Sequence, residues 1–207
     1  MDSVFLKKNG FTKDDALCMY IPNSYDFYWN STANNFRDRM LDEYHKFWSK
    51  KRLSKAKTLN LNHKEVIVLA SIVHKEAFSS DELSVIAGVY LNRLSRNMKL
   101  QADPTVIYSI KRVSKNYDTL IKRLYYKDLR IKSKYNTYVN KGLPPGPIGM
   151  PDILSVDAVL NPEEHKYLYF VVDPYNMGYH NFSKTLKEHN KKKKSYIKWL
   201  RRNKIYR

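Results

Sequence analysis

Hydrophobic residues recur at helical spacing along the first half of the chain, which predicts a succession of amphipathic helices. Apolar side chains at 36, 40, 44, 47 and 48 predict a helix over 33–49. Residues 1–30 lack this period and contain Pro22, so we expect them to be irregular. Residues 50–60 are polar and basic and are expected to form a connector. Asn62 and Glu65 have the spacing of a capping box, which predicts the start of a strongly apolar helix.

Four more helices follow from the same kind of reasoning. Ser79 and Glu82 repeat the capping-box spacing and predict a helix that runs through residue 94. Asp103 followed by Pro104 is typical of an N-cap with proline at the first helical position, which predicts a shorter helix through residue 110. Residues 112–135 form a basic insertion that we expect to be helical around 120–124, and a short helix is predicted over 154–160.

The last third of the chain contains a rigid loop and the strongest strand signal. Residues 142–147 read Gly-Leu-Pro-Pro-Gly-Pro, which excludes regular structure. Residues 167–172 predict a strand, and a return through 179–182 would complete a hairpin. Ser183 is expected to cap a final helix. The pattern therefore predicts an α+β fold, mostly helical, with a small antiparallel β-sheet.

Composition limits the possible classes of protein without choosing a partner. The chain has 207 residues, 43% of them hydrophobic and 14% aromatic, which fits one globular domain and argues against global disorder. A formal net charge of +18 favours anionic partners. The lysines are scattered and do not gather with aromatic residues on one face, so we do not expect a nucleic-acid-binding protein.

Several kinds of chemistry find no support in the sequence. The single cysteine, Cys18, excludes an intramolecular disulfide and a cysteine-based metal cluster. The six histidines lack metal-ligand spacing, and the HExxH, Walker A, GxGxxG and GxSxG patterns are absent. We therefore expect no metal and no cofactor. No apolar run is long enough to span a membrane, and the start of the chain does not resemble a signal peptide.

Glu76 is the residue best suited to catalysis. It shares an apolar helix face with Ile72 and Val73. Burial disfavours the charged carboxylate and raises its pKa, so such a group can protonate a glycosidic oxygen near neutral pH. A structural salt bridge is the alternative. Polar or rigid residues that could form the walls of a cleft are Gln101, Asp103, Asn136, Tyr138 and the 142–148 loop.

The number of carboxylates in this cleft favours one type of reaction. Glycosidases usually use two carboxylates, but Asp103 is already explained as a helix cap. Glu76 is then the one clear acid, which points away from simple hydrolysis. A single carboxylate suits a reaction in which the sugar supplies its own nucleophile.

Several segments together resemble the endolytic murein transglycosylase family, the YceG-like or MltG group. The similarity is strongest at Leu100–Tyr108, which reads LQADPTVIY. It extends in family order from about residue 21 to 190 through residues 21–25, 70–76, 86–94, 135–138, 142–148, 167–171, 180–183 and 189–190. The resemblance implies a catalytic domain over 21–207. Residues 1–20 would then be a leader and a remnant of the family's LysM-like module.

The resemblance implies cleavage of a glycan strand without water. Glu76 would protonate the oxygen between N-acetylmuramic acid and N-acetylglucosamine. It would then take the proton of the muramyl C6 hydroxyl as that oxygen attacks C1, leaving a 1,6-anhydromuramyl end. Residues implied to bind the sugar are Gln101, Asp103, Asn136, Tyr138, Gly142, Pro144, Pro145, Gly146, His180, Ser183 and Asn190.

The resemblance also implies partners and a location. The partners would be peptidoglycan glycan strands and, as a candidate, the cell-wall elongation machinery. Full-length members lie at the periplasmic face of the inner membrane in the cell envelope. We expect any membrane contact of this chain to require an N-terminal anchor that is absent from the sequence.

Two departures from the family pattern keep alternatives open. The family often has glutamate where this chain has His74, which favours Glu76 as the catalyst, and threonine where this chain has Ala77. The missing hydroxyl at Ala77 and the missing anchor would also suit a non-catalytic peptidoglycan-binding or scaffold protein on the same fold. A hydrolytic muramidase would need a second carboxylate that holds a water opposite Glu76.

Overall fold

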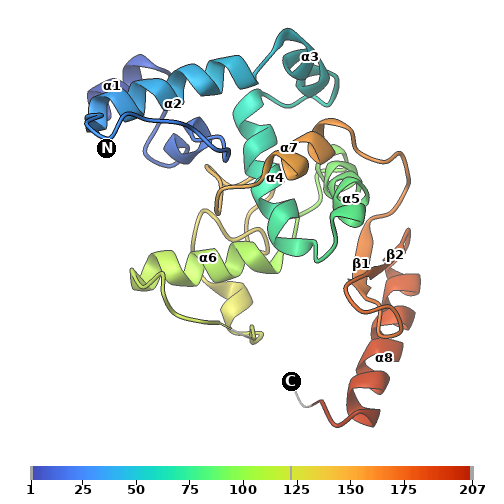
Figure 1. Cartoon of the computed structure of the whole chain (residues 1–207). Coiled ribbons are helices and arrows are strands. Elements are labelled where there is room, and N and C mark those ends of the chain that lie inside the picture. Colours follow the sequence, from blue (N-terminus) through green and yellow to red (C-terminus); the bar gives the residue numbers. More distant parts are fainter. Residues whose placement is uncertain (1, 122, 206–207) are drawn as a thin grey trace.

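The centre of the molecule is a buried helix surrounded by other helices. The computed structural model describes residues 2–121 and 123–205 (Figure 1). Helix α4 (His63–Glu76) packs against α5 (Leu83–Ser95), α6 (Asp103–Ser114) and α7 (Ile153–Leu160). Every side chain of α4 from Val66 to Val73 is buried, as expected for a helix at the centre of a core.

The start of α4 confirms the predicted capping box. The Asn62 side chain accepts hydrogen bonds from the backbone N–H groups of Lys64 and Glu65, and the Glu65 carboxylate accepts one from Asn62 N. The helix over 154–160 is also confirmed as α7, whose N-cap Asp152 accepts from Ser155 N. These local caps fix where the two central helices begin.

The N-terminal region is more helical than the sequence pattern predicts. Helix α2 (Ala33–Phe47) confirms the helix over 33–49. Residues 1–30 are not wholly irregular, because α1 (Ser3–Lys8) and a 3₁₀ turn (Ala16–Met19) lie within the described part of this segment. The predicted connector at 50–60 is wrong: Lys50–Thr58 form helix α3, capped by Ser49. Lysines and alanine favour helix, and burial of Ala56 adds to this preference.

The leader packs into the same core as the central helices. Leu6, Phe11, Cys18 and Met19 are all buried and belong to the main hydrophobic cluster. The proposed origin of residues 1–20 as a remnant of a LysM-like module stays a prediction. Burial raises the pKa of the Cys18 thiol to about 12, so this cysteine is a structural residue.

Two helix starts differ from the prediction. A 3₁₀ turn (Ser80–Glu82) precedes α5, and Glu82 does not complete a capping box because its carboxylate accepts hydrogen bonds from His180. The N-cap of α6 is Ala102, and Asp103 is the first helical residue, without a capping hydrogen bond. The prediction of Asp103 as a helix cap is therefore wrong, and its carboxylate is available for another role.

The basic insertion is mostly non-helical. Helix α6 continues to Ser114 and ends at Lys115, which has left-handed backbone conformation with φ of 54°. The helix predicted around 120–124 is wrong for the described residues of that segment, and residue 122 lies outside them. A 3₁₀ turn (Asp128–Arg130) follows.

A hairpin and a long helix complete the fold. Strands β1 (Tyr169–Val172) and β2 (His180–Ser183) pair antiparallel, with Tyr169 opposite Ser183, which confirms the predicted hairpin. Helix α8 (Leu186–Arg202) packs on both strands, on the side of the molecule away from α1–α3 (Figure 1). Thr185, and not Ser183, caps α8, because the chain stays extended through Ser183. The architecture confirms the α+β class.

The helices of the described residues are all too short or too polar for a membrane span. Their most apolar segments belong to the core around α4.

Candidate active site

Glu76 opens into a polar cavity of about 420 Å³. It is the last residue of α4, and the chain turns into an extended conformation at Ala77 directly after it. Further side chains reach the cavity from α5, from the start of α6, from β1 and from α8. The residues that line it include Tyr90, Arg93, Gln101, Asp103, Tyr138, Tyr169, His189, Asn190 and Lys193.

The surroundings of Glu76 suit an acid that also acts as a base. The hydroxyl of Tyr90, a residue that is 1% exposed, donates a hydrogen bond to Glu76 Oε1 at 3.0 Å. Burial raises the pKa of Glu76 to about 7, and the charge of Asp103 adds to this increase. The Tyr90 hydrogen bond and the charge of Arg93 oppose it. A carboxyl with this pKa holds and releases a proton near neutral pH.

A second carboxylate, Asp103, lies in the same cavity and is engaged by a tyrosine. The hydroxyl of Tyr138 donates to Asp103 Oδ1 at 2.6 Å. Burial and the charge of Asp103 raise the pKa of Tyr138 above its usual value, so this hydroxyl stays protonated and serves as a donor. Asp103 therefore lines the cavity and does not have the helix-capping role expected from the sequence.

Asn136 lies beneath the cavity and does not line it. The residue is fully buried, and its side-chain amide donates to Leu129 O at 3.1 Å and to Ile131 O at 2.9 Å. Its Oδ1 accepts from Tyr138 N at 2.9 Å. The geometry therefore makes Asn136 a positioning residue for Tyr138, and a direct sugar contact stays a prediction.

Gln101 presents its side chain to the cavity from a strained backbone. It has a φ of 51°, which is uncommon for a residue other than glycine. Bonds on both sides hold this conformation: Gln101 N donates to Thr137 O at 3.2 Å, and Ala102 N donates to Thr137 Oγ1 at 3.0 Å. Strain that the surrounding structure maintains in this way is typical of functional sites.

Arg93, on α5, contacts the segment before β1 and the loop before Gln101. It is 7% exposed, and its guanidinium donates to Leu168 O at 2.6 Å and to Leu100 O at 2.7 Å. The same group lies 5.2 Å from the ring centre of Tyr169. Arg93 thus holds α5 against the entry to β1 and against the loop before Gln101.

The structure brings five of the predicted site residues together. Glu76, Gln101, Asp103, Tyr138 and Asn190 all line the cavity. Sequence reasoning did not single out the other residues around it: Tyr90, Arg93, Tyr169, His189 and Lys193. The spacing of Tyr90 and Arg93, three residues apart on one helix, was the available signal that both face the same side.

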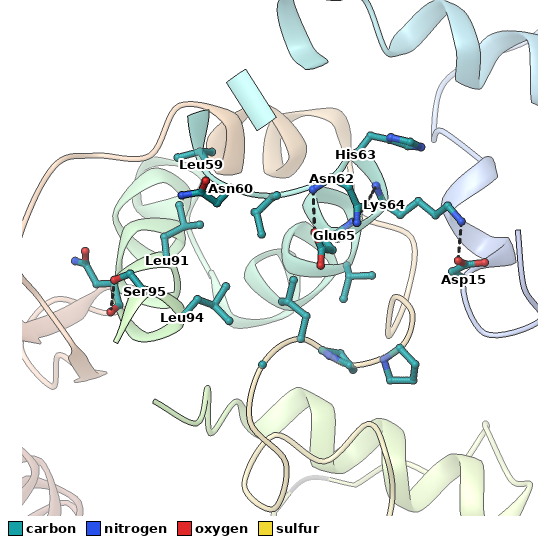
Figure 2. A pocket seen from close by; sticks show the side chains of 17 residues that line it. Asp15, Leu59, Asn60, Asn62, His63, Lys64, Glu65, Leu91, Leu94 and Ser95 are labelled. Atoms are coloured by element: carbon teal, nitrogen blue, oxygen red, sulfur yellow. Dashed lines mark hydrogen bonds and ion pairs between the residues drawn. The ribbon is translucent and has the colours of Figure 1, made fainter. Parts of the chain in front are cut away.

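The Gly-Pro loop lies elsewhere. Gly142, Pro144 and Pro145 line a separate pocket of about 810 Å³ beside Asn62 and Glu65 (Figure 2). These two residues mark the opposite end of α4 from Glu76, roughly 20 Å away along the helix. The loop is therefore not a wall of the Glu76 cavity, and sugar binding by these residues stays a prediction.

Gly146, His180 and Ser183 are engaged in packing. A Cβ atom added to Gly146 would lie 1.9 Å from Asp14 O, so this glycine permits close contact between two backbone segments. His180 Nδ1 lies 2.7 Å from Glu82 Oε2, and Ser183 is 1% exposed. None of the three lines the Glu76 cavity as far as the structure describes it.

Comparisons with known proteins point to one family. Residues 4–195 of the chain match the family model described as "YceG-like family". A protein of Bacillus subtilis (strain 168) named endolytic murein transglycosylase is 44% identical over 133 residues, which cover 64% of this chain and 34% of that protein. A protein of the same name from Streptococcus pneumoniae serotype 2 is 33% identical over 156 residues, which cover 73% of this chain and 27% of that protein.

A solved structure extends the comparison to the fold. The crystal structure of a YceG-like protein from Listeria monocytogenes superimposes with a TM-score of 0.69 at 35% identity. The match covers 84% of this chain and 53% of that one. The chain thus spans about a third or less of the two named relatives and about half of the solved structure.

Proposed function

The chain belongs to the YceG-like family, and we propose that it is the catalytic part of an endolytic lytic transglycosylase that cleaves glycan strands within peptidoglycan. The names of its relatives support this class of activity. The observation that carries the proposal is Glu76, an acid with a pKa raised to about 7 at the edge of a polar cavity.

The proposed reaction uses Glu76 twice. Its protonated carboxyl donates the proton to the oxygen that links C1 of N-acetylmuramic acid to N-acetylglucosamine, and the C1–O bond breaks. The carboxylate then accepts the proton of the muramyl C6 hydroxyl, whose oxygen forms the new bond to C1. The products are a free N-acetylglucosamine end and a 1,6-anhydromuramyl end, and no water is consumed.

Neighbouring residues give Glu76 the properties that this reaction needs. The Tyr90 hydroxyl donates to Glu76 Oε1, and the backbone N–H of Asp103 also donates to the Glu76 carboxylate, so both groups orient the acid. The raised pKa lets Glu76 hold a proton near neutral pH, and the proton is still easily lost in the second step. Gln101, Tyr138 and Asn190 supply polar groups along the cavity for sugar hydroxyls and acetamido groups.

Hydrolysis is the second candidate, and Asp103 is the observation that favours it. Its carboxylate does not cap α6 and lines the same cavity as Glu76. A carboxylate in such a place can activate a water. The hydrogen bond from Tyr138 occupies one Asp103 oxygen and leaves fewer positions for a water, which favours the transglycosylase.

Partners and location follow as proposals from the same activity. We propose that the partner is the peptidoglycan glycan strand and that the protein acts in the cell envelope. Contact with the cell-wall elongation machinery, and membrane contact through an N-terminal anchor, remain predictions from the family resemblance.

The test is digestion of purified peptidoglycan by the chain and by Glu76→Gln, with products identified by mass spectrometry. The proposal predicts internal fragments with anhydromuramyl ends from the wild type and none from the variant. Reducing ends, heavier by one water, would support hydrolysis. Binding without cleavage by either protein would support a non-catalytic scaffold.

A further inference from the structure

The cavity contains a cation that the proposed reaction does not use. Lys193 lies on the face of α8 that carries Leu186, His189 and Asn190, since these positions are three to four residues apart. All four residues line the cavity that contains Glu76. The reacting sugars are uncharged at the bond that breaks, so the cleavage step gives Lys193 no role.

The cavity carries charges of both signs. Asp103 and Arg93 are the charges that act on Glu76. Burial together with the charges of Lys193 and Arg93 lowers the pKa of His189, whose ring stacks on Tyr169 at a centroid distance of 5.4 Å. Arg93 therefore acts on both Glu76 and the α8 side of the cavity, where Lys193 adds a second positive charge.

The Lys193 ammonium group is available to a ligand. Its neighbour Lys192 donates a hydrogen bond to Phe182 O and so helps to hold α8 on the hairpin. Among residues 2–121 and 123–205, no carboxylate or carbonyl oxygen pairs with Lys193, which is exposed. An unpaired ammonium at the rim of a polar cavity favours an anionic group of the ligand.

We propose that Lys193 binds a carboxylate of the peptide that muramic acid carries, so that the preferred substrate is a peptide-bearing strand with free carboxylates. This inference rests on the proposed function. The peptide is attached through the lactyl group at C3 of the muramyl ring, close to the bond that Glu76 would cleave. A carboxylate on this branch is the anionic group nearest to the reacting centre, and Arg93 adds its charge to the same part of the cavity.

The test measures binding separately from cleavage. Uncrosslinked glycan strands that carry peptides are prepared in two forms, one with free carboxylates and one with these groups converted to amides. Affinity for each form is measured by fluorescence anisotropy in the Glu76→Gln background, in which no strand is cut. Lys193→Gln is compared with Lys198→Gln, which removes the same charge from the same helix at a position that does not line the cavity.

The expected result is specific to one lysine. Lys193→Gln should bind the free-carboxylate strands roughly twofold to fivefold more weakly than Lys198→Gln, as expected for one exposed ion pair. The two variants should bind the amidated strands equally. Equal affinities of both variants for the free-carboxylate strands would overturn the proposal, because attraction by the overall charge would then suffice. Failure of the proposed function would appear separately, as no cleavage of either strand by the wild type.

Discussion

Removal of the Tyr90 hydroxyl should shift the pH dependence of cleavage to higher pH. In the folded protein this hydroxyl donates to Glu76 Oε1 at 3.0 Å and lowers the pKa of a carboxyl that burial has raised to about 7. Tyr90→Phe removes the donor and leaves the ring in place. The charged form of Glu76 loses stabilisation that the protonated form does not need, so the pKa of Glu76 rises further.

The size of the shift follows from the strength of such a bond. Hydrogen bonds to charged groups contribute about 1.5–3 kcal/mol, and 1.36 kcal/mol corresponds to one pKa unit. Glu76 borders an open cavity in which water can replace part of the lost bond. We therefore expect an increase of roughly one unit. Cleavage needs protonated Glu76, so the rate falls as pH rises through its pKa, and in the variant this fall should occur roughly one unit higher.

The assay is the initial rate of strand cleavage as a function of pH for the wild type and Tyr90→Phe. Tyr138→Phe is the matched control, because it removes a hydroxyl that donates to Asp103 in the same cavity. Its pH profile should shift less than that of Tyr90→Phe. An unchanged profile for Tyr90→Phe, or a fall at lower pH, would refute the assignment of Glu76 as the titrating acid. Carbon NMR titration of the Glu76 carboxyl checks the pKa without substrate.

Three other predictions concern stability. Glu76→Gln should stabilise the fold above about pH 7 by roughly 1–3 kcal/mol and change little below about pH 4.5. The reason is that the raised pKa of Glu76 contributes stability at low pH that is lost as pH rises through about 7. Thermal unfolding at both pH values tests this. Asn136→Ala should destabilise by about 2–4 kcal/mol in urea unfolding, since it removes a fully buried side chain and its hydrogen bonds to two half-buried carbonyls. Gly146→Ala should lower the melting temperature strongly through its clash with Asp14, whereas Gly149→Ala, with its nearest atom at 3.5 Å, should have little effect.

Local signals in the sequence were sufficient to predict the central helices and the hairpin. The Asn62–Glu65 capping box and the apolar run that follows it specify α4 through residues close in sequence. Helix α3 has the Ser49 cap but no apolar run that predicts a helix. Burial of Ala56 and the ion pair of Arg52 with Asp157, more than a hundred residues away, add to its stability.

Residues of the candidate site could be predicted where the local sequence pattern indicates their position, and were missed where contacts with distant segments determine it. The position of Glu76 on an apolar helix made it a candidate, and the structure shows that it borders a polar cavity. Asp103 was wrongly assigned as a helix cap, because its carboxylate accepts a hydrogen bond from Tyr138, 35 residues later in the chain. Tyr90 and Arg93 were not singled out, because their cavity partners come from other elements.

The source of the oxygen bound to muramyl C1 after cleavage distinguishes transglycosylation from hydrolysis. Peptidoglycan is digested in water labelled with heavy oxygen, and the fragments are analysed by mass spectrometry. We expect anhydromuramyl ends without label from the wild type, because the C6 hydroxyl attacks C1, and no fragments from Glu76→Gln. Labelled reducing ends would contradict it, and would make Asp103 the residue that activates a water.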